Sequence, residues 1–148
     1  MSRGWLLDTN VISEFAKGAQ VDVGVKAWIE RAPENQLYLS VVTLGEIAKG
    51  IALGEARGRN MSSHRHFLEL ELPDRFAERI LAFNAEAAIV WGQLMSGLGG
   101  NRDDERRLAI DGQIAATAKI ASLDICSRNV RDFERFGIVS IVNPFTAR

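Results

Sequence analysis

Three acidic residues that are far apart in the chain have similar surroundings. Asp8 directly follows the apolar run at residues 5–7, so a buried strand is expected to end on a carboxylate. Glu46 and Asp111 lie beside apolar segments much later in the sequence. Carboxylate oxygens are the ligands that hard divalent cations such as Mg²⁺ or Mn²⁺ take, together with several waters. The three acids therefore point to metal-assisted chemistry on phosphate.

Each acid also has a purely structural explanation. Asp8 could be the N-cap of the helix that follows it, because aspartate is among the most favoured residues there. Glu46 lies three residues after Thr43, the spacing of a capping box. Asp111 could cap a helix over residues 112–123. Taken singly, each residue leaves both explanations open, but their joint appearance at successive strand-to-helix junctions or helix starts favours a shared site.

Other residue patterns with catalytic potential are weaker. His64 and His66 are two residues apart, so on a helix they point to different sides and cannot easily share one ion. The glycine-rich stretch 97–100 follows a predicted helix and lacks the Gly-Lys ending of a phosphate loop. The single cysteine, Cys126, lies in a predicted strand, where a small buried hydrophobe is the expected role. Covalent acyl transfer has no motif to support it.

Composition limits the class of protein. The 148 residues fit a single domain, residues 1–148, that can bury most of its apolar surface in one core. The net charge of −1 gives no overall basic field, so any patch that binds nucleic acid must be local. The N-terminus carries no cationic leader with a long apolar stretch, and no run is long enough to span a bilayer. We therefore expect a cytoplasmic protein with no membrane association.

The elements that must position the acids alternate between strand and helix. Short apolar runs predict strands at residues 4–7, 37–40, 80–83, 125–126 and 138–142. Helical spacing of apolar residues predicts helices at residues 21–31, from 44 to about 54–60, 62–72, 84–98, 112–123 and 130–136. Pro73 is expected to stop the third of these helices. The polar stretch 101–107 is expected to be a loop.

This alternation implies right-handed crossovers and an α/β fold, with a mostly parallel sheet in a three-layer α/β/α sandwich. Ligands bind such sheets at the carboxyl ends of the strands, near a topological switch. Asp8 fits that location because it follows its strand immediately. Glu46 would lie in the first turns of the helix after the second strand, and Asp111 near the start of the helix that precedes the strand at residue 125.

Basic residues are scattered, with one local group. Arg128, Arg131 and Arg135 could share one side of a short helix near the proposed site, and Lys49 and Lys119 are further candidates for phosphate contact. A solvated helix face is the alternative explanation for the same residues.

Four further blocks stand out in the sequence: LLDTNVISE at residues 6–14, SVVTLGEI at 40–47, DGQIAATA at 111–118 and SRNVRDF at 127–133. They resemble the signature blocks of PIN-domain proteins, and more narrowly those of VapC and FitB-like toxins of bacterial type II toxin–antitoxin modules. They occur in the family's order, and the resemblance runs from Leu6 to Pro144, nearly the whole chain.

The resemblance implies an Mg²⁺- or Mn²⁺-dependent endoribonuclease. By that similarity Asp8, Glu46 and Asp111 occupy the family's acidic positions. Asp8 and Asp111 would hold the metal most directly, whereas Glu46 would reach it through water or help to activate the attacking water. In-line attack would expel the ribose 3′ oxygen and leave 5′-phosphate and 3′-hydroxyl ends.

The resemblance also marks further site residues and partners. The family's fourth acidic position is Asn129 here, which can ligate through its amide oxygen but brings no charge. Asp132 could support the site electrostatically or cap the short helix. Ser127 stands where the family commonly has threonine, and it keeps the hydroxyl group. Thr9 is a further candidate site residue, and Arg128 and Arg131 are candidate contacts to RNA phosphates. The implied partners are RNA, an antitoxin that covers the active groove, and a second toxin copy in a homodimer or larger assembly.

Two readings from other classes compete with the nuclease. One is a PIN-like binding or regulatory module without catalysis, against which the retention of all three acids argues. The other is a haloacid-dehalogenase-like phosphatase, which also places an aspartate after its first strand. That family requires a second aspartate two residues later, where this chain has Asn10.

Overall fold

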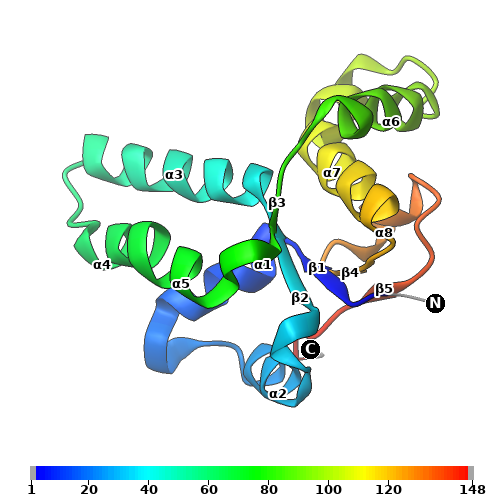
Figure 1. The fold of residues 1–148 in the computed structure, drawn as a ribbon. Coiled ribbons are helices and arrows are strands. Elements are labelled where there is room, and N and C mark those ends of the chain that lie inside the picture. Colours follow the sequence, from blue (N-terminus) through cyan, green and yellow to red (C-terminus); the bar gives the residue numbers. More distant parts are fainter. Residues whose placement is uncertain (1–2, 147–148) are drawn as a thin grey trace.

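Five parallel strands form one central sheet in the computed structural model, which describes residues 3–146 (Figure 1). The strands are β1 Trp5–Leu7, β2 Leu37–Ser40, β3 Ile80–Leu81, β4 Asp124–Cys126 and β5 Ile141–Val142, in the order β3-β2-β1-β4-β5. The chain runs outward from β1 to β3 and then returns to β4 on the other side of β1. The predicted parallel α/β sandwich is confirmed, and the topological switch lies between β1 and β4.

Helices connect the strands and cover both faces of the sheet. The longer ones are α2 Val23–Arg31, α3 Val41–Ala56, α6 Ala85–Ser96 and α7 Arg102–Ala121. The short ones are α1 Thr9–Ile12, η1 Ser13–Gln20, η2 Glu34–Gln36, α4 Ser62–His66, η3 Phe67–Glu71, α5 Leu72–Phe76, η4 Ala77–Arg79 and α8 Val130–Glu134. No helix in the described part of the chain has the length and apolar character needed to cross a membrane.

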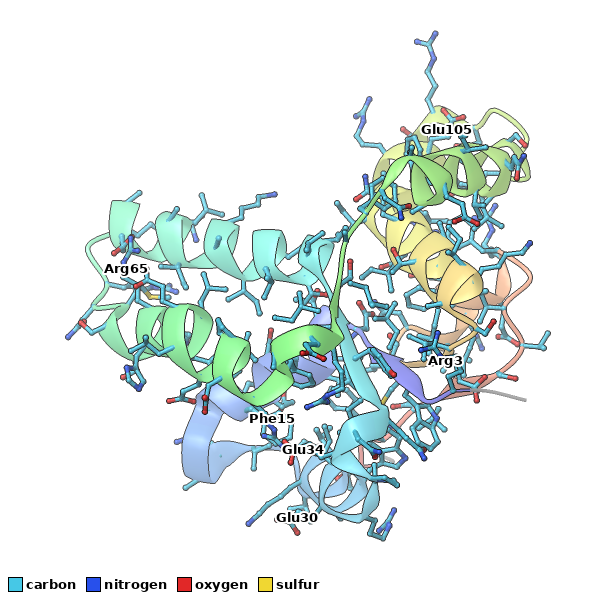
Figure 2. All side chains as sticks on the ribbon, viewed as in Figure 1. Arg3, Phe15, Glu30, Glu34, Arg65 and Glu105 are labelled. Carbon is cyan, nitrogen blue, oxygen red and sulfur yellow. The ribbon has the colours of Figure 1, made fainter. Side chains whose placement is uncertain are left out.

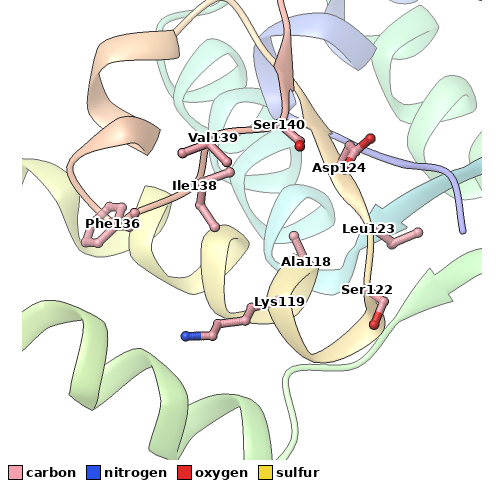
Figure 3. Close-up of a pocket in the computed structure, with 10 residues that line it drawn as sticks. Ala118, Lys119, Ser122, Leu123, Asp124, Phe136, Ile138, Val139 and Ser140 are labelled. Carbon is pink, nitrogen blue, oxygen red and sulfur yellow. The ribbon is translucent and has the colours of Figure 1, made fainter. Parts of the chain in front are cut away.

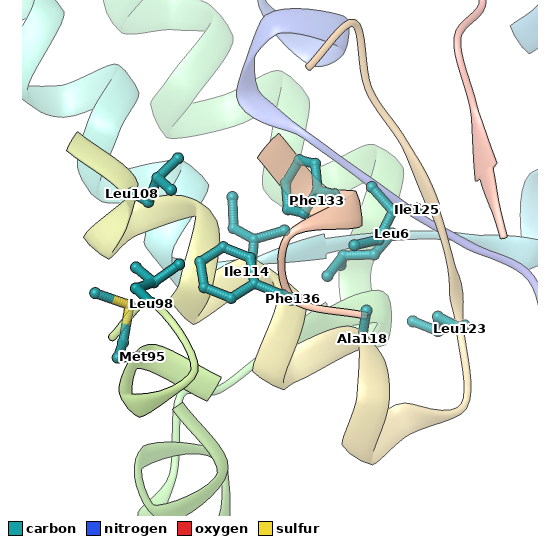
Figure 4. Close-up of a cluster of buried hydrophobic side chains, with 11 residues drawn as sticks. Leu6, Met95, Leu98, Leu108, Ile114, Ala118, Leu123, Ile125, Phe133 and Phe136 are labelled. Carbon is teal, nitrogen blue, oxygen red and sulfur yellow. The ribbon is translucent and has the colours of Figure 1, made fainter. Parts of the chain in front are cut away.

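Alternating side chains of the strands divide the core into two clusters. Leu6 and Ile125 point to the face covered by α6, α7 and α8, where they pack with side chains such as Ile114 and Phe133 (Figure 4). Leu7 and Cys126 point to the opposite face, together with apolar residues of α1, α2, η3 and α5. Cys126 is fully buried, as expected of a small core hydrophobe. The central strand β1 is thus covered on both sides, which explains its continuous apolar sequence.

The polar stretch 101–107 is helical, contrary to the prediction of a loop. Asn101 caps α7, because its side chain accepts a hydrogen bond from the backbone N–H of Asp104 at 3.0 Å. Acidic residues in the first turn favour the positive end of the helix dipole. Asp111 therefore lies in the middle of a 20-residue helix, and the interpretation of Asp111 as an N-cap is wrong.

The capping box proposed for Thr43 and Glu46 is also wrong. Helix α3 begins at Val41, and its N-cap is Ser40, whose side chain accepts from the backbone N–H of Val42 at 3.0 Å. Thr43 is fully buried within the first turn. Glu46 lies in the second turn, beyond the reach of a capping box.

Pro73 does not end the helical segment that precedes it. The chain passes from α4 through a turn of π-helix, η3, into α5, and Pro73 stands in the first turn of α5, where proline is tolerated. The predicted strands at residues 80–83 and 138–142 shorten to two residues each.

Candidate active site

Asp8 lies at the carboxyl end of β1, at the topological switch, and only 2% of its surface is exposed. Three groups donate hydrogen bonds to its carboxylate: the Thr9 backbone N–H at 2.8 Å, the Ser127 hydroxyl at 2.7 Å and the Asn10 amide at 3.2 Å. Asp8 is thus the N-cap of α1, as one of the two explanations held. It is also a buried carboxyl group whose orientation is fixed by three donors.

The backbone beyond β4 forms the other side of this cradle. The Asp8 N–H donates to the Cys126 carbonyl at 2.9 Å, which continues the β1–β4 pairing into the site. Ser127 is fully buried, and its hydroxyl accepts from the Asn129 N–H at 2.9 Å while donating to Asp8. Asn10 links the two segments, because its side-chain oxygen Oδ1 accepts a hydrogen bond from the Arg128 backbone N–H at 3.2 Å.

Glu46 is tied to the same site through Thr9. The Thr9 hydroxyl donates a hydrogen bond to the Glu46 carboxylate, and the Thr43 hydroxyl lies 3.2 Å from Thr9 Oγ1. These contacts join α3 to α1 directly beside Asp8. The negative charge of Glu46 in turn contributes to the raised pKa of Asp8, whose largest cause is burial. The hydrogen bonds from Ser127, Thr9 and Asn10 oppose that rise.

Asp111 comes to this edge of the sheet from α7. Its pKa is raised to about 7, first by burial and then by the charges of Asp8, Asp132 and Glu46, while Arg107 acts in the opposite direction. Mutual repulsion of this kind requires short distances. The structure therefore places Asp111, on α7, near enough to Asp8 and Glu46 for their charges to act on its pKa.

The donor set fits a hard cation that retains water. Among the described residues, no group of three or more His, Cys, Asp or Glu side chains is placed to hold one ion together. Two direct carboxylate ligands completed by waters are the usual arrangement for Mg²⁺ in proteins. Neighbouring carboxylates whose pKa values are raised also gain most from a positive charge placed between them.

Asp132 and Asn129 lie at the margin of the site. Asp132 forms an ion pair with Arg107 at 3.0 Å, and its charge raises the pKa of Asp111. The N-cap of α8 is Asn129 and makes no side-chain capping bond. Of the two roles considered for Asp132, the electrostatic one agrees with these contacts.

The predicted basic residues separate into different places. Arg128 and Arg131 line a polar hollow of about 380 Å³ together with Asn129 and Asp132, next to the Asp8 cradle. The Arg128 guanidinium also lies 4.7 Å from the centre of the Phe145 ring. Arg135 instead pairs with Asp104 at 3.1 Å.

Lys119 is far from the carboxylates, so its candidacy as a phosphate contact there is wrong. It lines a pocket of about 540 Å³ at the amino end of β4, together with Ser122, Asp124 and Ser140 (Figure 3). Asp8 follows the carboxyl end of the neighbouring strand β1. Lys119 is also eight residues beyond Asp111 on α7, a separation of about 12 Å along a helix.

Three residues of the site's surroundings escaped prediction. Asn10 enters the sequence analysis only as the residue that argues against a phosphatase, although its position two residues after Asp8 lets it reach both strand ends. Thr43, which the sequence suggests as a helix cap, instead contacts Thr9. Arg107 stands one helical turn before Asp111, so the two side chains share a face of α7. The sequence does not show this spacing to be significant while residues 101–107 are taken for a loop.

The chain matches the PIN domain family over residues 5–139. It belongs to the PIN-domain family. This PIN-domain protein is 35% identical over 140 residues to "VapC ribonuclease Y4jK" of Sinorhizobium fredii, a match that covers 95% of this chain and 96% of the relative. It is also 35% identical to "Toxin FitB" of Neisseria gonorrhoeae, covering 95% of this chain and 97% of that protein.

Solved structures agree with the family assignment. A crystal structure of FitAcB from Neisseria gonorrhoeae superposes with a TM-score of 0.74 at 33% identity and covers 94% of this chain and 96% of that chain. A structure of FitAB bound to a DNA fragment gives a TM-score of 0.76 at 33% identity, with 97% of this chain and 96% of that chain covered. The DNA-bound VapBC structure from Salmonella typhimurium, at 23% identity and a TM-score of 0.64, shows the same fold.

Proposed function

We propose that this PIN-domain protein is the toxin of a type II toxin–antitoxin module and an Mg²⁺- or Mn²⁺-dependent endoribonuclease. The observation that carries the proposal is the placing of Asp111 on α7 near Asp8 and Glu46, where burial first and then the charges of Asp8, Asp132 and Glu46 raise the pKa of Asp111 to about 7. The relatives named VapC ribonuclease and Toxin FitB support RNA as the substrate and toxicity as the biological effect.

In this proposal each side chain has a separate task. Asp8 and Asp111 bind the cation directly, and the Ser127 and Thr9 donors hold the Asp8 carboxylate in place. Glu46, fixed by Thr9, accepts the proton of the attacking water. Arg128 and Arg131 bind flanking phosphates and orient the strand without reading its bases. The bound cation supplies the positive charge that activates water and polarises a phosphoryl oxygen.

The proposal includes protein partners. FitB is the named toxin among the relatives, and a structure that is 33% identical to this chain is that of FitAB bound to DNA. We expect an antitoxin to cover the carboxylates of this chain and keep it inactive. A homodimer or larger toxin–antitoxin assembly in the cytoplasm is part of the same expectation.

The test is cleavage of labelled total RNA by partner-free protein in Mg²⁺, in Mn²⁺ and in EDTA. We expect discrete fragments that require metal and disappear in Asp8→Asn and Asp111→Asn. Asp103→Asn is the matched control, because Asp103 is an exposed acid in the first turn of α7 and should leave cleavage unchanged. Intact RNA in every condition, with no metal binding by calorimetry, would support the non-catalytic module instead.

A further inference from the structure

A second hollow adjoins the carboxylates on the side of β1 that faces β2, opposite the hollow lined by Arg128 and Arg131. Its volume is about 320 Å³, and it lies between α1 and η1, α3, and the α4–η3 segment. Two of the residues that line it, Thr9 and Glu46, also belong to the candidate active site. An occupant of this cavity would therefore lie beside Glu46, to which the proposed function gives the proton of the attacking water.

The walls of the cavity are mainly apolar. Ile47, Ile51, Met61 and Phe67 line it, and Phe67 is only 6% exposed, so it forms part of the permanent core. The outer ends of α3 and α4 are held together by Arg65, which donates two hydrogen bonds to Glu55 at 2.8 and 2.6 Å (Figure 2). The cavity is thus built between fixed elements.

One cationic side chain, Lys17, and one imidazole, His64, accompany the apolar walls. Lys17 lines the cavity and uses one donor for an ion pair with Glu14 at 2.6 Å, yet its side chain remains 53% exposed. His64 also lines the cavity and is exposed. An apolar hollow with positive charge beside it suits a flat uncharged ring that is attached to a phosphodiester.

We propose that this cavity receives one unpaired base of the RNA, next to the phosphate that is cut. The inference rests on the proposed nuclease function. The volume is at the lower end of the range of about 300–1,000 Å³ seen for small-molecule pockets, which suits a single base and excludes a duplex. Bases can enter such a cavity only from single strands, loops or ends. The cavity would make cleavage depend on the base at one position and restrict it to unpaired RNA.

Gly50 provides a direct way to fill the cavity. It lines the cavity from helix α3, and a Cβ at this position would meet no atom within 4 Å. Leucine can therefore be accommodated by the protein itself while occupying space that the base would need. Gly92→Leu is the matched control, since Gly92 is an exposed helical glycine of α6 with equally open surroundings.

The experiment compares oligoribonucleotides that carry a normal base or an abasic ribose at each position flanking a mapped cleavage site. We expect the wild-type kcat/KM to fall about tenfold at one position, within the range of about 5- to 150-fold for loss of one stacked base. Gly50→Leu should cleave both substrates at the lower rate, and Gly92→Leu should behave as wild type. Equal cleavage of both substrates by the wild-type protein, or full discrimination by Gly50→Leu, would overturn the inference.

A binding measurement separates this inference from the nuclease proposal. The affinity of Asp111→Asn for oligoadenylate, with and without one abasic position, reports on the cavity without cleavage. If Asp111→Asn binds the intact oligomer more tightly than the abasic one, and the added substitution Gly50→Leu removes that preference, the cavity is a base-binding site. This holds even if the wild-type protein cuts no RNA. The same cavity between α1, α3 and α4 could instead receive an apolar side chain of a protein partner. Weaker antitoxin binding by Gly50→Leu together with an unchanged base preference would establish that occupant and exclude ours.

Discussion

Replacing Asp111 with asparagine should stabilise the metal-free protein at neutral pH while destroying its response to Mg²⁺. The pKa of Asp111 rises from 3.8 to about 7 on folding, because of burial and the charges of Asp8, Asp132 and Glu46. A carboxyl group whose pKa is raised favours the folded state only below its unfolded pKa. Its contribution is lost as the pH climbs from about 4 to 7.

The size of the effect follows from the shift. Each pKa unit corresponds to about 1.4 kcal/mol, so three units would give about 4 kcal/mol. Asp111 is only partly buried, and screening by solvent reduces this to about 2 kcal/mol. For a chain of this length that difference raises the melting temperature by about 4–8 °C.

The assay is urea and thermal unfolding of wild type and Asp111→Asn in EDTA between pH 4 and pH 8. The two proteins should be equally stable near pH 4, and the variant should gain its full advantage by about pH 7. On the proposed function, added Mg²⁺ should then stabilise the wild type and leave the variant unchanged, because an ion that binds only the folded state favours that state. A variant that is less stable than wild type at pH 8 in EDTA, or an advantage independent of pH, would refute this reasoning.

Two further substitutions test the support of the site. Ser127→Ala should lower the free energy of unfolding by about 1–3 kcal/mol, because the buried Asp8 carboxylate loses a donor at 2.7 Å. It should also move the acid limb of the pH–cleavage profile to higher pH, because the pKa of Asp8 rises further without that bond. Ser127→Thr should restore the stability and the pH profile of the wild type. An unchanged profile in Ser127→Ala would contradict the positioning role. Gly112→Ala would place a Cβ 2.9 Å from Met95 Sδ and 3.2 Å from the Trp91 ring, so it should destabilise the protein by about 1–3 kcal/mol and reduce cleavage as α7 shifts. Gly92→Ala, in open space on α6, should instead stabilise the protein by about 0.5–1 kcal/mol, and equal effects of the two substitutions would argue against close α6–α7 packing as their cause.

The parts of the site that could be predicted are those with a local signal. Asp8 directly follows a strand that is apolar on both faces, and this alone places it at the carboxyl edge of a parallel sheet. Glu46 follows the second strand closely enough for its location in the first turns of a helix to be foreseen. Predicting these two positions required only the order of strands and helices along the chain.

Other features could not be read locally. Asn101 and the acids that follow it form a helix-start signal, but the high charge and adjacent glycines of the segment imitate a loop. Ser40 and Thr43 are both plausible caps, and only the burial of Thr43 against Thr9 decides between them. The hydrogen bonds donated by the Arg128 N–H to the Asn10 side chain and by the Thr9 hydroxyl to Glu46 join segments separated by 118 and 37 residues. Contacts of that separation depend on the completed tertiary fold.

The hydrogen bond between Asp8 and Ser127 spans 119 residues. A growing chain therefore carries its first candidate catalytic acid at the very start of synthesis, but lacks both Asp111 and the donor that orients Asp8 until most of the polypeptide has been made. The parallel topology, which returns to β1 only with β4, enforces this order. The complete acidic site can thus form only after translation has passed Ser127, so on the proposed function an unfinished chain has no assembled nuclease site close to the ribosome that is making it.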